Sequence, residues 1–276
     1  MNHFKMTVIC FVLLFCSLSL NSFAAPLDVF SNEAGNLRIA GGTAHIPVMK
    51  IAAARIMTIN PRIHISIAGG GSGLGIKQVG EGLVDIGNAG RKASGEEIAR
   101  YGLTLHKWAI DGVCVVVNPA NPVRSLSQKQ IMAIFAGEIT NWKDVGGSDS
   151  RINLYTRDNG SGTRAVFWKK GLKKGSIAPT ANFVVSNGAM KAAVSQDPFA
   201  IGYISIGHLN NSVAAVSFDG IQPSLENVKS GKYPIARGLY SITKGEPTGL
   251  AKKFIDYLLT AEGQQIVATK GFVPVK

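Results

Sequence analysis

Short apolar runs alternate with amphipathic segments along most of this chain. Runs such as 37–40, 64–67 and 83–87 have the length and composition of buried strands. They alternate with segments in which apolar side chains recur every three or four positions, which indicates helices. We expect helices at residues 47–59, 76–81, 95–101, 127–136, 187–195, 247–259 and 261–268. Strands that alternate with helices predict an α/β fold with a mostly parallel sheet covered on both faces.

Two further apolar runs are interpreted as crossings between two lobes. We expect these hinge crossings near residues 110–112 and 199–202. This divides the chain into a first lobe of residues 25–111 and 203–276 and a second lobe of residues 112–202. A cleft between two lobes is a common place for a small-ligand site.

The first 24 residues have the features of a secretory signal peptide. Lys5 provides the positive start, residues 8–20 are apolar, and Ser-Phe-Ala at 22–24 forms a small-x-small cleavage site. Cys16 lies in this segment, but the bulky Phe15 before it fits a lipoprotein processing site poorly. We therefore expect a soluble protein exported to the periplasm.

Cys114 is the one cysteine left after the expected cleavage, so the mature chain cannot form an internal disulfide. It lies in the apolar run 113–117, which is typical of a central strand. We expect a small buried hydrophobe there and no redox chemistry.

The charge balance favours small anions as ligands. The chain is 46% hydrophobic and 17% charged, which indicates a folded globular protein, and its formal net charge is +12. A positive balance attracts anions in general. The lysines are spread along the chain, however, and no basic stripe interleaved with aromatic residues is present. Together with the export segment, this argues against a nucleic-acid partner.

Three junctions between a predicted strand and a predicted helix are rich in Gly, Ser and Thr. They are residues 41–45, 69–75 and 157–163. Backbone N–H groups point outward at the positive end of a helix, and glycines let an anion approach the backbone closely. The Ser and Thr side chains add hydroxyl groups, and Arg157 offers a planar pair of donors for an oxyanion. The three junctions together predict a site for one tetrahedral oxyanion.

Such a donor set suffices for useful affinity. Hydrogen bonds to charged groups contribute about 1.5–3 kcal/mol each, and a micromolar site needs about −8.2 kcal/mol in total. Competing motifs are absent from the sequence: there is no Walker A string, no complete G-x-G-x-x-G and no G-x-S-x-G. The histidines show no metal-ligand spacing. We expect neither a metal nor a cofactor.

These segments resemble the periplasmic phosphate-binding proteins of Pst-type ABC importers. The resemblance runs from about residue 37 to residue 275. It is carried by Gly42-Thr43-Ala44, Gly69-Gly70-Gly71-Ser72-Gly73, Val84-Asp85-Ile86-Gly87, Ile139-Thr140-Asn141-Trp142, Arg157 to Thr163, Ala200-Ile201-Gly202-Tyr203 and Ser230-Gly231-Lys232-Tyr233-Pro234. The Arg-x-x-x-Ser-Gly-Thr element is the most specific of these.

The resemblance implies a two-lobed, type II periplasmic-binding fold and a non-enzymatic monomer that delivers inorganic phosphate to a membrane permease. It also implies the residues that bind the phosphate, which are Gly42, Thr43, Ala44, Ser72, Gly90, Arg91, Arg157, Ser161, Gly162 and Thr163.

The chain departs from the family pattern at Gly90. Some members have an aspartate there that accepts a proton from phosphate and rejects sulfate, and others have serine followed by arginine. This chain has Gly90-Arg91, so the aspartate mechanism does not carry over. Arg91 either contacts the anion or holds its loop, and the sequence leaves both roles open.

Three other functions stay open at this point. The cleft could bind a different oxyanion or a phosphorylated small molecule, which the missing aspartate motivates. A secreted phosphoester hydrolase would use the same pocket, but the sequence offers no metal cluster or evident nucleophile–base pair. A signalling or surface-interaction role for the basic lobes is the fourth hypothesis.

Overall fold

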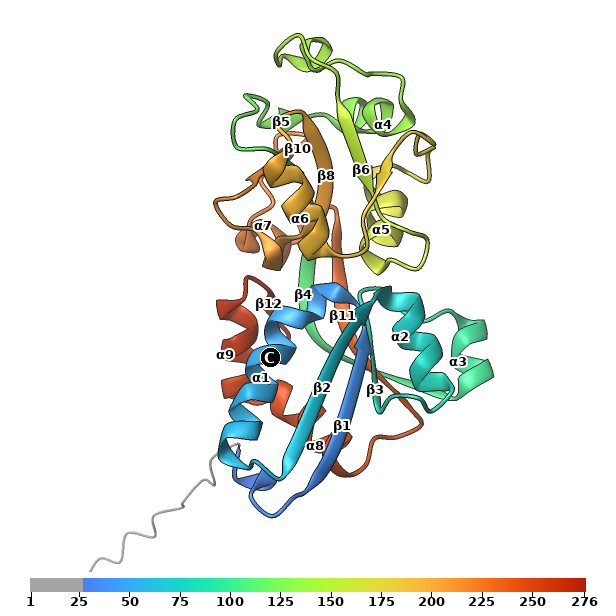
Figure 1. The fold of residues 1–276 in the computed structure, drawn as a ribbon, viewed down its shortest axis with the longest axis vertical. Helices are drawn as coiled ribbons and strands as arrows, with labels where there is room; N and C mark the ends of the chain where they lie inside the picture. The colour runs from blue at the N-terminus through green and yellow to red at the C-terminus, as the bar shows by residue number, and fades with distance from the viewer. Residues whose placement is uncertain (1–26) are drawn as a thin grey trace, which may run out of the picture.

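The computed structural model describes residues 27–276 of the chain. The expected signal peptide, residues 1–24, lies outside the described residues. The described chain forms two lobes stacked along the long axis of the molecule (Figure 1). Two long strands connect them.

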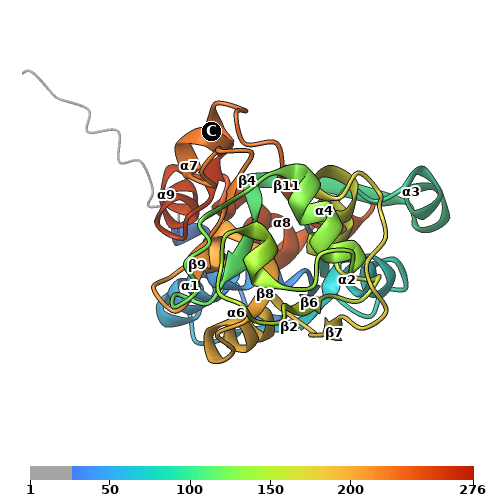
Figure 2. The same cartoon turned by 90° about the horizontal axis from the view of Figure 1, so that it is seen from above.

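The first lobe contains the N-terminal and C-terminal parts of the described chain. Its elements are η1 (Asp28–Phe30), β1 (Gly35–Gly41), η2 (Thr43–His45), α1 (Ile46–Ile59), β2 (Ile63–Gly70), α2 (Gly71–Gly80), β3 (Ile86–Ala89), α3 (Gly95–Tyr101), α8 (Gly249–Leu258) and α9 (Ala261–Thr269). Helix α3 projects to one side of this lobe in both views (Figures 1 and 2).

The second lobe is built from the middle of the chain. Its elements are β5 (Ser125–Leu126), α4 (Gln128–Ala136), η3 (Trp142–Val145), β6 (Asn153–Thr156), α5 (Gly162–Val166), the π-helical turn η4 (Phe167–Gly171), β7 (Asn182–Phe183), α6 (Asn187–Gln196), β8 (Ala200–Ser205), η5 (Ile206–His208), β9 (Ala214–Ala215), β10 (Ser217–Phe218) and α7 (Leu225–Lys229). The strands β4 (Leu103–Val117) and β11 (Ala236–Lys244) run between the lobes, and β12 (Val273–Pro274) pairs with β4.

One sheet passes through both lobes, in the order β2-β1-β3-β11-β4-β8-β6-β7. The pairs of β1 with β2 and β3, and of β6 with β7 and β8, are parallel. The pairs that involve β4 or β11 are antiparallel. The predicted α/β class and two-lobed architecture are thus confirmed, with antiparallel strands confined to the middle of the sheet.

The return crossing differs from the predicted one. Residues 203–235, which we expected in the first lobe, pack in the second, where Tyr203, Val216 and Tyr233 belong to the buried core. The apolar run at β8 pairs with residues 113–117 of β4 and is therefore an internal strand of the second lobe. The chain returns on β11, which pairs with the first-lobe half of β4. The apolar composition of β8 fits either role, so only its pairing partner identifies it.

The glycine-rich segment that we expected as a loop is the start of α2. Helix α2 begins at Gly71, five residues before the predicted start at Ile76. Glycine disfavours helices intrinsically, but here it lets α2 lie directly on the sheet. A Cβ at Gly75 would come within 2.9 Å of Gly41 Cα and Ala40 O. Close packing against β1 therefore outweighs the low helix propensity.

Helix ends follow the local sequence where capping residues are present. Ser127 accepts a hydrogen bond from the backbone N–H of Gln130, whose side chain accepts one from the N–H of Ser127, which is a capping box. Gly137 ends α4 in the left-handed conformation at φ 81°. Ser94 and Glu97 form a second capping box at α3. The predicted bounds of α3 are confirmed for this reason, and α4 begins one residue after its predicted start because Ser127 is the cap.

Cys114 is fully buried in β4, as expected for a core thiol. Burial raises the pKa of this thiol well above its usual range. Between residues 27 and 276, no helix is long and apolar enough to cross a membrane.

Candidate functional site

A small cavity lies between the lobes, next to the first turns of η2, α2 and α5. The space open to the centre of a water-sized sphere is only about 10 Å³, so the cavity is tightly closed. The residues that line it are Gly42, Thr43, Ala44, His45, Gly71, Ser72, Gly90, Arg157, Ser161, Gly162, Thr163 and Arg237. The three predicted junctions therefore converge on one space, and of the predicted site residues only Arg91 lies outside it.

Arg157 is the most unusual residue of the cavity. It follows β6 and is only 1% exposed. Its backbone N–H donates to the Tyr203 hydroxyl over 3.1 Å, and its Nη2 donates to the Val185 carbonyl over 3.0 Å. Its Nε is buried without a hydrogen-bond partner, and among residues 27–276 no carboxylate lies within ion-pair distance of it. Burial lowers the pKa of Arg157, but an arginine stays protonated in proteins. The structure thus holds a positive charge that the protein does not neutralise directly.

Two serines at helix starts place hydroxyl groups at the cavity. The Ser161 hydroxyl oxygen caps α5 and accepts a hydrogen bond from the Arg164 N–H over 3.2 Å. The Ser72 oxygen, in the first turn of α2, accepts one from the Gly90 N–H over 2.9 Å. In both cases a backbone donor holds the oxygen, so the hydroxyl proton is free to turn toward a ligand.

A second cation at the cavity, Arg237, escaped the sequence analysis. It lies on β11 and forms a buried ion pair with Asp111 of β4, with 2.7 Å between Nη2 and Oδ2. Its Nη2 also donates to the Thr163 hydroxyl over 3.1 Å. Asp111 is the one charged residue in 108–117, and Arg237 is the one charged residue in 235–243; this pattern was the available signal. Their pairing depends on the register of β4 and β11, which the sequence does not reveal.

Arg91 holds its loop and does not reach the cavity. Its guanidinium forms a two-pronged ion pair with Glu97, at 2.7 and 2.8 Å, and donates to the Lys92 carbonyl over 3.0 Å. This pairing lowers the pKa of the Glu97 carboxyl. Of the two roles left open for Arg91, the structure therefore supports the loop-holding one.

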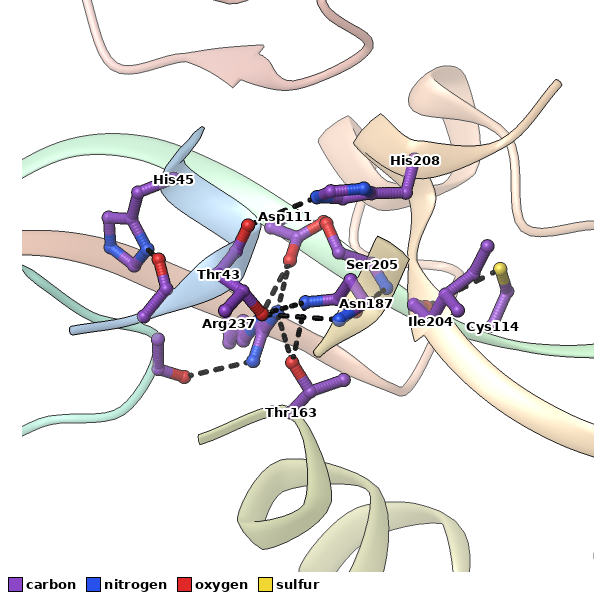
Figure 3. Close-up of polar contacts among 12 residues, drawn as sticks. Thr43, His45, Asp111, Cys114, Thr163, Asn187, Ile204, Ser205, His208 and Arg237 are labelled. Carbon is purple, nitrogen blue, oxygen red and sulfur yellow. Dashed lines mark hydrogen bonds and ion pairs between the residues drawn. The ribbon is translucent and has the colours of Figure 1, made fainter. Parts of the chain in front are cut away.

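Two histidines near the cavity are neutral. Burial lowers the pKa of His45 to about 3 and that of His208 to about 4. His45 donates through Nδ1 to the Gly42 carbonyl, and His208 donates through Nε2 to the Thr43 carbonyl (Figure 3). Among the residues that the structure describes, no group of His, Cys, Asp and Glu is arranged to hold a metal ion.

The lobes touch across the cavity. The Gly73 N–H of α2 donates to the Gly160 carbonyl of the second lobe over 3.0 Å. The Ser72 hydroxyl packs against Gly162, where an added Cβ would lie 2.1 Å from its oxygen. The structure is therefore a closed form, in which residues from both lobes enclose the same small space.

The chain is similar to known binding proteins over most of its length. Residues 31–262 match the family model of the PBP superfamily domain. The phosphate-binding protein PstS of Bacillus subtilis is 41% identical over 244 residues, which are 87% of this chain and 81% of that protein. PstS of Borreliella burgdorferi is 30% identical over 252 residues, with coverages of 86% and 89%.

The chain is also similar in structure to solved phosphate-transport binding proteins. A Clostridium perfringens ABC-transporter substrate-binding protein, solved with bound phosphate, matches with a TM-score of 0.82 at 36% identity and covers 88% of this chain and 100% of that one. An ABC-type phosphate transport receptor from Vibrio cholerae matches with a TM-score of 0.69 at 32% identity, with coverages of 86% and 99%. The shared fold, the length of the match and the identity lead to one conclusion: this chain belongs to the PstS phosphate-binding protein family within the PBP superfamily.

Proposed function

We propose that this protein captures inorganic phosphate in the interlobe cavity and delivers it to an ABC importer. The observation that carries this proposal is Arg157, a buried cation without a carboxylate partner in the described chain. A buried unpaired charge is costly, and a small anion in the adjacent cavity would remove that cost. The names of the relatives, and the phosphate bound in the C. perfringens protein, support phosphate as the anion.

The donors come from both lobes, which couples binding to closure. Thr43 and Ser72 belong to the first lobe, and Arg157, Ser161 and Thr163 to the second. An anion that bonds to both sets binds the closed form better than an open one and so shifts the population toward it. We assign phosphate contact to Gly42, Thr43, Ala44, Ser72, Gly90, Arg157, Ser161, Gly162 and Thr163, and a loop-holding role to Arg91.

A second candidate ligand is another oxyanion such as sulfate. The observation that favours it is the cavity lining, whose side chains include two arginines and no carboxylate. A site without a carboxylate lacks the strongest acceptor for a ligand proton. It therefore has less means to prefer protonated phosphate over an anion that carries no proton.

Isothermal titration separates these candidates. Mature protein freed of co-purified ligand would be titrated with phosphate, sulfate and molybdate, each alone and in competition. We expect phosphate to bind with micromolar or better affinity and to displace sulfate, which should bind as well because no carboxylate in the lining rejects it. Absence of heat with phosphate, together with failure of phosphate to displace the other anions, would refute the proposed function.

We further propose export to the periplasm and a membrane permease as partner. The N-terminal segment of the sequence and the transporter role of the C. perfringens relative support this. Fractionation of cells that express the full chain tests the first part, with recovery of processed protein from the periplasmic fraction as the expected result. Retention of the uncleaved chain in the cytoplasm would contradict it.

A further inference from the structure

Asn187 lies behind the cavity and contacts both lobes. It is the first residue of α6 and is 0% exposed. Its side-chain Nδ2 donates to the Thr43 hydroxyl oxygen over 3.0 Å and to the Thr163 hydroxyl oxygen over 3.4 Å (Figure 3). Its backbone N–H also donates to the Thr43 hydroxyl oxygen, over 3.2 Å. Asn187 itself does not line the cavity, whereas both threonines do.

The orientation of the Asn187 amide follows from its other neighbour. The side-chain Oδ1 accepts a hydrogen bond from the backbone N–H of Ser205 over 3.0 Å. A backbone N–H can only donate, so the atom that faces Ser205 must be the oxygen. The NH₂ group therefore faces the threonines. Because an NH₂ group only donates, the threonine oxygens must act as acceptors toward Asn187.

This arrangement uses up the acceptor capacity of both hydroxyls. A hydroxyl oxygen has two lone pairs and one proton to donate. The Thr43 oxygen accepts from the backbone N–H and from Nδ2 of Asn187. The Thr163 oxygen accepts from Asn187 Nδ2 and from Arg237 Nη2. Each hydroxyl has only its proton left to offer to a ligand.

We propose that Asn187 is a positioning residue that fixes the hydroxyls of Thr43 and Thr163 as hydrogen-bond donors, so that the cavity favours a ligand oxygen that carries no proton. The proposal rests on the proposed function and deepens it, because it names the protonation state that the site selects. Without Asn187, the Thr43 hydroxyl is free to rotate and to accept a ligand proton. Phosphate carries one or two protons near neutral pH. A site that selects proton-free oxygens should therefore bind it more tightly at a pH where it carries one proton than at a pH where it carries two.

The neighbouring charged and titratable groups are the same in every protein that the test compares. His208 faces Thr43, and His45 lies at the cavity, and both have pKa values held well below the pH range of the test by burial. Arg157 stays protonated. Burial raises the pKa of Asp111, its ion pair with Arg237 opposes that shift, and none of the substitutions removes either residue. Lys191 is the charged residue on the same helix as Asn187. A difference between variant and wild type in how phosphate affinity changes with pH therefore reports the effect of the substituted residue.

The experiment measures the phosphate dissociation constant at about pH 5.5 and about pH 8, on either side of the second ionisation of phosphate. For the wild-type protein we expect binding at least tenfold weaker at the lower pH. Asn187→Ala should weaken binding about tenfold at pH 8 and reduce the ratio of the two constants to less than half of the wild-type value. Asn187→Asp, which turns donors toward the threonines into acceptors, should weaken binding at pH 8 more than 100-fold.

Asn118 provides the matched control. It is buried at the opposite end of α6, where its Nδ2 donates to the carbonyls of Val194 and Ser195 over 3.1 and 2.9 Å. Asn118→Ala should lower the thermal stability as Asn187→Ala does, but leave the affinity ratio unchanged. A parallel weakening at both pH values in Asn187→Ala, with the wild-type ratio kept, would show a merely structural role and overturn the proposal.

A second variant tests the same idea if Asn187→Ala does not fold. Thr43→Val keeps the shape of the side chain and retains Asn187 but removes the hydroxyl donor. It should also reduce the ratio of the phosphate dissociation constants at the two pH values. A wild-type ratio in Thr43→Val would overturn the proposal. Failure of the proposed function is distinguishable, because then the wild-type protein itself would not bind phosphate at either pH.

Discussion

The guanidinium of Arg157 shows how one residue can depend on a ligand. It is buried, it donates to a single backbone carbonyl through its side chain, and its Nε has no partner. Leaving a charge buried and unpaired costs several kcal/mol in typical proteins. Arg237 shows the opposite situation, because Asp111 neutralises it at 2.7 Å. The two arginines at the same cavity therefore have different roles, the first toward the anion and the second toward the protein.

Arg157→Met is expected to abolish phosphate binding without harming the fold. Two lost charge-assisted hydrogen bonds correspond to about 3–6 kcal/mol, and hence to a loss of at least about 100-fold in affinity. The thermal midpoint of the ligand-free protein should stay the same or rise, because an apolar side chain replaces an unpaired buried charge. Titration calorimetry and thermal unfolding measure the two quantities. A ligand-free midpoint several degrees lower would contradict this account of Arg157.

Arg91→Ala is the matched arginine substitution outside the cavity. Because Arg91 pairs with Glu97 and not with the cavity, the phosphate affinity should stay within about twofold of wild type. Stability should fall by no more than about 1 kcal/mol, as for other partly exposed ion pairs. A tenfold loss of affinity would show that Arg91 does reach the anion.

At the scale of elements, glycines set how closely the lobes approach. Helix α5 faces α2 across the cavity, and Gly162 in its first turn touches the side chain of Ser72. The contact exists only when the lobes are closed, because the two helices belong to different lobes. A larger side chain at position 162 would therefore destabilise the closed form and leave the folding of each lobe unaffected.

Gly162→Ala is expected to weaken phosphate binding by about 5- to 150-fold, because its Cβ would lie 2.1 Å from the Ser72 oxygen and such overpacking costs about 1–3 kcal/mol. The ligand-free protein should be as stable as wild type or slightly more stable, since alanine favours the helix by up to about 1 kcal/mol. Gly188→Ala in α6 is the control: its Cβ would meet only Ser186 Oγ, at 3.7 Å. It should give the same gain in stability with unchanged affinity. Equal affinities for the two variants would rule out the steric argument.

For the whole molecule, the crossings β4 and β11 place charged residues where the lobes meet. Asp111 lies on β4 and Arg237 on β11, paired directly in register. His45 of the first lobe lines the cavity, and His208 of the second lobe contacts the Thr43 carbonyl beside it (Figure 3). Protonation of either histidine would add positive charge beside Arg157 and Arg237, which are among the causes that lower the pKa of His208.

The stability of the molecule should therefore fall in acid. The pKa values of His45 and His208 are about 3 and about 4 in the folded protein and about 6.5 in an unfolded chain. Between about pH 6.5 and 4 the unfolded state binds protons that the folded state does not. The contribution of the neutral histidines to the free energy of unfolding is thus complete above about pH 6.5. It is lost as the pH falls, by up to about 1.4 kcal/mol per pH unit for each histidine.

Urea unfolding between pH 7 and pH 4.5 measures this slope. His208→Gln keeps a donor for the Thr43 carbonyl but cannot titrate, so the slope should decrease. His64→Gln, at an exposed position of β2, should leave it unchanged. Equal slopes in all three proteins would contradict the assignment.

Much of this site was predictable because its parts are local. A strand, a Gly/Ser/Thr turn and a helix form within about fifteen residues, and their chemistry can be read along the chain. Thr43, Ser72 and Ser161 were found in this way, and all three line the cavity. The capped helices α3 and α4 were found for the same reason, since a capping box involves residues three apart.

The sequence by itself determined the α/β pattern, the helix caps and the donor-rich junctions, because each depends on residues close together in the chain. Only the tertiary structure decided which charges meet. Arg237 and Asp111 are 126 positions apart, and Asn187 and Thr43 are 144 apart. Strand pairing also decided that β8 stays in the second lobe and that β11 carries the return crossing. Pairings over such distances depend on the register and packing of the complete sheet, and no local pattern of residues encodes them.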